Sequence, residues 1–149
     1  MAKNNVMFGT KRIISLISSI RNSSNKFLLA LLNNNGLKGL ATSHGDILAS
    51  LFETSPMSMQ ELAAKIGKDK STVTALVDKL IAGDYVIKEK NLVDSRGVIV
   101  SLTPKGLELK PTTDKIGDDL LNTAYDGFTE TDKQELTRLL LKMKKNFEK

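Results

Sequence analysis

The pattern of apolar and polar positions between residues 57 and 103 predicts two short helices followed by a β-hairpin. Ser58 and Glu61 form a capping box that begins the first helix, and Gly67 suits the left-handed backbone at its end. Asp69 is placed to cap the second helix, which Gly83 ends. Apolar residues recur at helical spacing on the inner sides: Leu62, Ala63, Ile66, Val73, Leu76, Val77 and Leu80. Two short helices joined by a tight turn are typical of a helix-turn-helix, whose second helix fits the major groove of DNA.

The outward side of the second predicted helix is short, polar and partly cationic. Its members are Lys70, Ser71, Thr72, Thr74, Asp78 and Lys79. We expect the three hydroxyl residues to contact bases or phosphates, whereas Lys68 and Lys70, at the helix start, would hold phosphates. Ser58 and Lys79 complete the set of DNA contacts predicted on the two helices. The alternative is an ordinary solvated helix face.

Two β-branched runs, 85–90 and 98–102, flank a turn-prone loop and predict an antiparallel hairpin. A hairpin directly after a recognition helix is a wing. Arg96 near its tip is predicted to enter a minor groove, where a narrow A·T-rich channel attracts guanidinium; the alternative is a solvated loop arginine. Asp94 would bond to the loop backbone or pair with Arg96, and Ser95 between them belongs to the predicted DNA-contacting tip.

Helical patterns flank this segment on both sides. One covers 10–34 and a second runs from about 42 until Pro56 closes it. After the wing, Thr103 and Pro104 begin a helix that runs toward Tyr125 with a kink or restart near Pro111, and Thr129 caps a last helix. The expected fold is mainly α with a small antiparallel β-hairpin wing, a winged helix-turn-helix with N- and C-terminal dimerisation helices.

The terminal helices carry more apolar side chains than one small lobe needs. In the last helix these are Leu136, Leu139, Leu140, Met143 and Phe147. They either fold back as an ordinary core or form a twofold interface between two chains. We favour a homodimer, because it would place two recognition helices about one DNA turn, roughly 34–36 Å, apart.

Residues 58–106 resemble the MarR (multiple antibiotic resistance regulator) family of winged-helix repressors. The matching motifs are Glu61-Leu62-Ala63, Ser71-Thr72-Val73-Thr74, Leu80 with Gly83, Asp94-x-Arg96, and Val100-Ser101-Leu102-Thr103-Pro104-Lys105-Gly106. The most specific feature is the distance from Asp-x-Arg to Leu-Thr-Pro-x-Gly. The flanking helices resemble the family more weakly.

The resemblance implies a single domain over 1–149, with a DNA-binding lobe at 42–103 and dimerisation helices at 10–34 and 112–147. It also implies a repressor that binds a pseudo-palindromic operator in double-stranded DNA. A small aromatic or phenolic effector at the junction of the two lobes would release the DNA.

Charge and composition narrow the possibilities. The 149 residues suffice for one domain and carry a net charge of +5, but the segment 56–110 holds nine basic against seven acidic residues. The motif pattern therefore carries the DNA prediction, not the charge. With no cysteine and one histidine, we expect no disulfide, no thiol-based redox sensing, no metal site and no cofactor. No apolar run is long enough to cross a bilayer and no signal peptide is recognisable, so we expect no membrane partner and a cytoplasmic protein.

The one histidine, His44, is expected as a first-turn surface residue rather than an effector ligand. Gly45 beside it stands where the family often has a bulky residue, which changes the usual pocket shape. His44 has no serine–aspartate motif around it and no glycine-rich phosphate loop follows a strand, so we expect no enzyme. The rival function is a winged-helix module that binds protein without DNA, and the polar outward helix face disfavours it.

Overall fold

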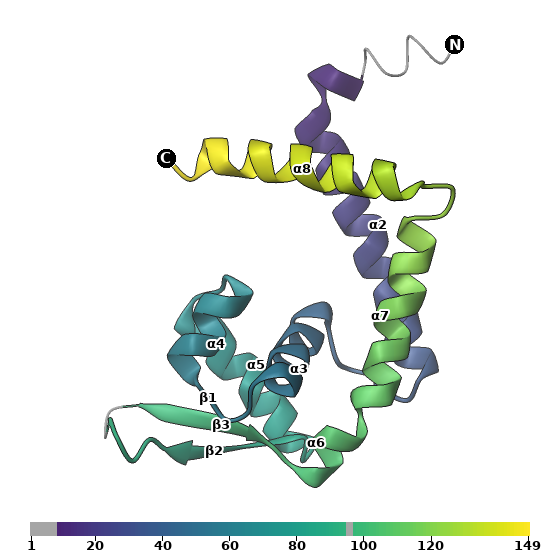
Figure 1. The fold of residues 1–149 in the computed structure, drawn as a ribbon. Coiled ribbons are helices and arrows are strands. Elements are labelled where there is room, and N and C mark those ends of the chain that lie inside the picture. Colours follow the sequence, from purple (N-terminus) through teal and green to yellow (C-terminus); the bar gives the residue numbers. More distant parts are fainter. Residues whose placement is uncertain (1–8, 95–96) are drawn as a thin grey trace. The chain divides into compact units, whose positions relative to one another are not determined.

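The computed structural model describes residues 9–94 and 97–149 in two compact parts, the first ending at Ile116 and the second beginning at Gly117. The first part contains the helices α2 (Ile13–Asn34), α3 (Thr42–Glu53), α4 (Met59–Ile66), α5 (Lys70–Ala82) and α6 (Pro104–Glu108). Its strands are β1 (Met57–Ser58), β2 (Val86–Lys90) and β3 (Val98–Leu102). Helix α7 (Lys110–Ala124) begins in the first part and ends in the second, which also contains α8 (Glu130–Phe147) (Figure 1). The expected fold class, mainly helical with a small antiparallel sheet, is confirmed.

The sheet has three antiparallel strands in the order β1-β3-β2. The predicted hairpin is confirmed, and its register pairs Val86 with Leu102 at the base and Lys90 with Val98 toward the tip. Strand β1 was not predicted, because two residues are too few to show an alternating pattern. It pairs Met57 with Val100 and therefore joins the start of α4 to the returning strand of the hairpin.

The core of the first part lies between the sheet and α3, α4 and α5, which cover one of its faces (Figure 1). Nine side chains are almost completely buried: Ile47, Leu48, Leu51, Leu62, Val73, Val77, Leu80, Val86 and Val100. Each contributes roughly 1.5–3 kcal/mol relative to an exposed position. Among the inward positions predicted for α4 and α5, Ala63, Ile66 and Leu76 pack against this core while remaining partly exposed. The buried set fixes the two helices of the helix-turn-helix against the wing.

The sequence Thr103-Pro104-Lys105-Gly106 makes the turn from the wing into α6. The Thr103 hydroxyl accepts the Gly106 N–H at 3.0 Å and donates to the Asp84 carbonyl. Pro104 occupies the start of the helix, where its missing N–H leaves no bond unmade. A Cβ atom on Gly106 would lie 2.0 Å from the Tyr85 carbonyl oxygen. The motif thus packs α6 directly onto the chain that enters β2.

Helix α7 restarts after a break at Leu109, one residue before its first position at Lys110. Pro111 is its second residue, where a proline is tolerated because a backbone N–H at that position would have no acceptor within the helix. The predicted restart near Pro111 is confirmed.

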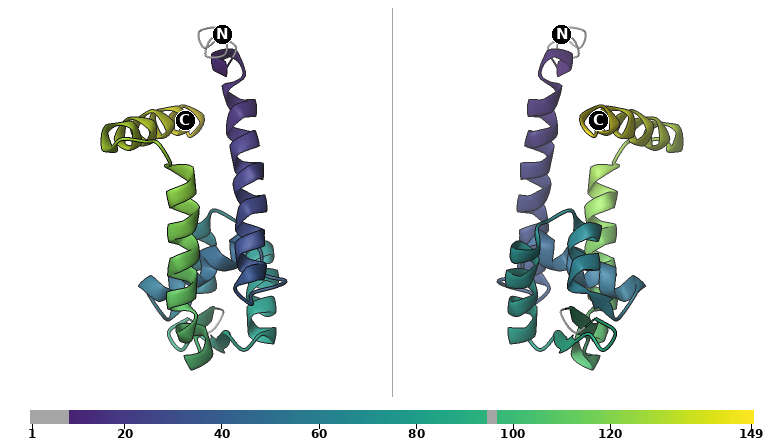
Figure 2. Two further views of the ribbon diagram at one scale, coloured as in Figure 1. Left: turned by 90° about the vertical axis from the view of Figure 1, so that its right-hand side faces the viewer. Right: turned by 90° about the vertical axis from the view of Figure 1, so that its left-hand side faces the viewer.

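Helix α2 is a single uninterrupted helix (Figure 2). Leu32, close to its C-terminal end, belongs to the buried core, whereas Ile14 and Ile20 are 55% and 60% exposed. The N-terminal half of α2 therefore presents large apolar side chains on its surface.

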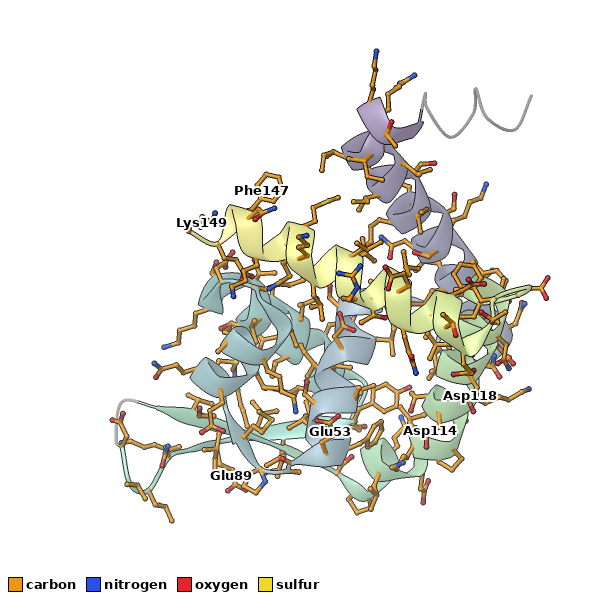
Figure 3. All side chains as sticks on the ribbon, turned by 45° about the horizontal axis from the view of Figure 1, so that its top comes forward. Glu53, Glu89, Asp114, Asp118, Phe147 and Lys149 are labelled. Atoms are coloured by element: carbon orange, nitrogen blue, oxygen red, sulfur yellow. The ribbon has the colours of Figure 1, made fainter. Side chains whose placement is uncertain are left out.

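Helix α8 begins with a complete capping box. The Asp132 N–H donates to the Thr129 hydroxyl and the Thr129 N–H donates to the Asp132 carboxylate, both at 3.0 Å. None of the residues of α8 is buried, although its stripe includes Leu139 and Leu140. Phe147 projects from the last turn and is 77% exposed (Figure 3).

Candidate nucleic-acid interface

The turn between α4 and α5 is built by local signals. The Ser58 hydroxyl accepts the Glu61 N–H at 3.0 Å and begins α4. Gly67 ends it in the left-handed conformation, with φ 68° and ψ 35°, a conformation that favours glycine. The Lys68 N–H donates back to the Ala63 carbonyl at 3.1 Å, so α5 can begin two residues later. The predicted helix-turn-helix is thus present.

Asp69 caps α5 and also binds two of the predicted DNA-contacting hydroxyls. Its Oδ1 accepts the Thr72 N–H at 2.8 Å and the Ser71 hydroxyl at 2.7 Å, and its Oδ2 accepts the Thr72 hydroxyl at 3.0 Å. The amide N–H of Thr72, then the two hydroxyls, hold the pKa of Asp69 at about 2. The carboxylate is therefore ionised across the working pH range. The cap was predicted from the sequence, whereas the bonds from the two hydroxyls were not.

The outward side of α5 is polar, as the sequence predicted. Ser71 and Thr72 are exposed and Thr74 is half-buried, with its hydroxyl donating to the Lys70 carbonyl at 2.8 Å. Farther along, Asp78 pairs with Lys88 of β2 at 2.9 Å. This ion pair connects the middle of the hairpin to the same side of α5.

The three lysines of the predicted set lie in different places. Lys68 is half-buried in the turn, while Lys70 is exposed at the first position of α5. Lys79 lies about two and a half turns farther along α5, with its ammonium nitrogen 3.8 Å from the position that a Cβ atom on Gly39 would take. Lys68 and Lys70 are thus close to the predicted base-contacting residues, and Lys79 is not.

The wing loop is held at its base by Asn91. The Asn91 side-chain oxygen accepts the Val93 N–H at 3.0 Å, and the Asn91 N–H donates to the Gly97 carbonyl at 3.0 Å. The Asp94 carbonyl accepts the Gly97 N–H at 2.9 Å. Leu92 and Val93 are each 98% exposed. Ser95 and Arg96, predicted at the tip, lie outside the described residues, as does the predicted Asp94–Arg96 pair.

One polar hollow brings three of the predicted site residues together. Ser58, Lys70 and Asp94 line a cavity of about 370 Å³ between the starts of α4 and α5 and the base of the wing loop. Its remaining lining residues are Met59, Gln60, Glu61, Asn91, Gly97 and Val98. The start of the second helix and the wing therefore border one continuous surface.

This arrangement of helix-turn-helix and wing is also found in the known proteins to which the chain is similar. The model of the MarR family matches residues 40–98, which cover α3, α4, α5, β2 and the wing loop. Over these residues the chain is similar to the MarR family. The HTH-type transcriptional regulator MgrA of Staphylococcus aureus is 26% identical to it over 97 residues. This match covers 65% of each chain, so it spans slightly less than two thirds of the relative's length.

Solved MarR structures have the same fold. A MarR protein from Peptoclostridium difficile is 27% identical, with a TM-score of 0.82, over 91% of this chain and 87% of the other. A mutant MarR of E. coli, solved in complex with operator DNA, is 22% identical, with a TM-score of 0.80, over 91% of this chain and 96% of the other. Over the residues that it matches, the chain is thus similar to a protein named as a transcriptional regulator.

His44 is buried, with 5% exposure, so the expectation of a surface histidine is wrong. Its Nδ1 accepts the Ala41 N–H at 2.8 Å, and it thereby caps α3, a helix whose cap position has no polar side chain. Burial, followed by the positive charge of Lys79, lowers the pKa of His44. Only a neutral imidazole nitrogen can accept this bond, so the lone pair of Nδ1 is already used. The misleading signal was the polar first turn, which does not show that the imidazole turns back onto the loop.

Among residues 9–94 and 97–149, no group of three or more histidines, aspartates and glutamates is arranged to hold a metal ion. No helix in the same ranges is both long and apolar enough to span a membrane.

Proposed function

We propose that this protein is a MarR-type regulator, which controls transcription by binding double-stranded DNA through α5 and the wing. The observation that carries the proposal is the exposed polar side of α5, anchored through its buried side to α4 and through Asp78 and Lys88 to the wing. An outward-facing polar helix of this kind fits a major groove, and a hairpin beside it reaches the adjoining backbone or minor groove. The operator DNA bound to the related E. coli protein supports the same function here.

The protein binds as a homodimer on a pseudo-palindromic operator. The apolar side chains of α2 and α8 support this part of the proposal, since Ile14, Ile20, Leu139 and Leu140 are 42–60% exposed in a single chain. Covering such side chains is worth roughly 1.5–3 kcal/mol each, and exposed apolar patches mark interaction surfaces. Residues 10–34 and 112–147 would form the interface. Two copies would then present two recognition helices to two half-sites.

Repression and its release by a small aromatic or phenolic effector complete the proposal. Both are inferred from the resemblance to the MarR family. A bound dimer would occupy promoter DNA that polymerase needs, and an effector that favours another spacing of the two recognition helices would lower operator affinity.

The decisive experiment is selection of bound sequences from random double-stranded DNA by the full chain at physiological salt. We expect enrichment of two inverted half-sites whose centres lie about 10–10.5 base pairs, or a multiple of this distance, apart. Failure to enrich any sequence would contradict DNA regulation and favour the protein-binding alternative. Sedimentation at micromolar concentration tests the dimer separately, and titration of the selected site with salicylate as a phenolic probe tests the effector.

A variant with Ser71 and Thr74 changed to alanine serves as the matched control. Neither residue belongs to the buried core, so the free energy of unfolding of the variant should lie within about 1 kcal/mol of the wild-type value. It should nevertheless lose preference for the selected half-site while retaining salt-dependent binding to any DNA.

A further inference from the structure

The three hydroxyl groups on the outward side of α5 each donate a hydrogen bond to an acceptor within the protein. Ser71 and Thr72 both bind the Asp69 carboxylate, at 2.7 and 3.0 Å. Thr74 binds the Lys70 carbonyl at 2.8 Å. An ionised carboxylate and a carbonyl can only accept, so in each of these three bonds the hydroxyl must be the donor.

This fixed direction limits what the hydroxyls can offer to DNA. A hydroxyl has one hydrogen and two lone pairs, so a hydroxyl that donates inward presents lone pairs outward. In the major groove, adenine N6 and cytosine N4 carry hydrogen-bond donors, while guanine O6 and thymine O4 are acceptors. A free serine or threonine can satisfy either kind, whereas Ser71 and Thr72 here match only the amino groups.

We propose that Asp69 determines base specificity without touching DNA, by making Ser71 and Thr72 acceptors that select adenine or cytosine over guanine or thymine. This inference rests on the proposed DNA binding. Asp69 is a positioning residue in this role: its carboxylate faces the helix start, and the bases meet the hydroxyls that it orients. The preference should not change around neutral pH, because the carboxylate remains ionised there.

The substitution Asp69→Asn reverses the direction of one of the two hydroxyl bonds. The Thr72 N–H still needs an acceptor, so the asparagine oxygen must take the place of Oδ1, which also serves Ser71. The amide nitrogen then takes the place of Oδ2 opposite the Thr72 hydroxyl and donates to it. The Thr72 hydrogen is thereby freed to face the groove. Asparagine caps helices as well as aspartate does, so α5 remains formed.

The test repeats the selection from random double-stranded DNA with the wild type, Asp69→Asn, Thr72→Val, and the double variant. We expect Asp69→Asn to change one base position in each half-site from adenine or cytosine to guanine or thymine, with a preference of roughly tenfold, the value of one good hydrogen bond. Thr72→Val and the double variant should show no preference between these pairs of bases at that position. The position contacted by Thr74, whose acceptor is a backbone carbonyl, serves as the internal control and should not change.

An Asp69→Asn protein that selects the same bases as the wild type at every position would overturn the inference while leaving the proposed DNA binding intact. A uniform loss of preference at all positions, including that of Thr74, would also overturn it, because the effect of Asp69 would then not be confined to the hydroxyls that it binds. If the wild type itself selects no sequence, the proposed function fails, and this inference fails with it.

Discussion

The substitution Gly106→Ala tests how closely α6 must pack on the entrance to the wing. A Cβ atom would lie 2.0 Å from the Tyr85 carbonyl oxygen and 3.2 Å from a methyl group of Leu102. Real Cβ contacts shorter than 3.0 Å are essentially never seen, so the two segments must move apart by about 1 Å. That movement strains the bond from the Thr103 N–H to the Tyr85 carbonyl, which is 3.1 Å long.

Overpacking of this kind typically costs about 1–3 kcal/mol, and a weakened hydrogen bond costs about 1 kcal/mol more. Alanine recovers about 0.5–1 kcal/mol because glycine is a poor helix former. We therefore expect the free energy of unfolding to fall by about 1–3 kcal/mol and the melting temperature by roughly 2–12 °C. Urea unfolding and thermal circular dichroism measure both quantities.

Gly45→Ala is the matched control, since Gly45 also lies in a helix but a Cβ atom there would have nothing within 4 Å. This variant should be as stable as the wild type or more stable by up to about 1 kcal/mol. A Gly106→Ala protein as stable as the Gly45→Ala control would show that α6 and β2 are not in the close contact described above.

Four further predictions concern binding, assembly and pH. Lys70→Ala should lower the slope of log affinity against log salt by about one, with little change in base preference, and an unchanged slope would exclude a phosphate contact. Arg96 is predicted to contact DNA from the sequence alone. Arg96→Ala should weaken binding to the selected operator by roughly 1–3 kcal/mol without altering the melting temperature. Equal affinity in this variant would exclude Arg96 from the interface. Leu139→Asp combined with Leu140→Asp should convert the dimer to monomers or poorly folded chains, and a wild-type monomer at micromolar concentration in the ultracentrifuge would refute the dimer. Because the pKa of His44 is lowered in the folded protein, the unfolded chain binds a proton more readily, so the free energy of unfolding should decrease as pH falls below 6.5, the ordinary histidine value. His44→Gln should flatten this pH dependence when it is measured by urea unfolding. An unchanged pH profile in that variant would assign the dependence to other groups.

Local signals predicted most of the fold because they act over three or four residues. Ser58, Asp69, Thr103 and Thr129 were all identifiable as helix caps, and each binds the backbone N–H three residues ahead. Gly67 adopts the left-handed conformation that its position required. Strand β1 escaped prediction because its pairing partner is more than 40 residues away and its own length gives no period.

The candidate site was predicted by residue type but not by hydrogen-bond direction. The pattern placed Ser71 and Thr72 on the outer side of α5, yet which way a hydroxyl donates depends on distances that only the folded turn sets. The burial of His44 could not be predicted for the same reason: its partner is the Ala41 N–H, a group that every residue except proline carries.

The exposed wing-loop residues Leu92 and Val93 and the capped start of α5 place different constraints on how this protein can diverge. Leu92 and Val93 contribute nothing to the core, so mutations or changes in loop length there are tolerated by the fold and free to be selected for new contacts. Asp69 has no such freedom, since one carboxylate both begins the helix and orients two hydroxyls. We therefore expect descendants of this protein to acquire new operators first through positions 92 and 93 of the wing loop, and to exchange Asp69 only together with Ser71 or Thr72.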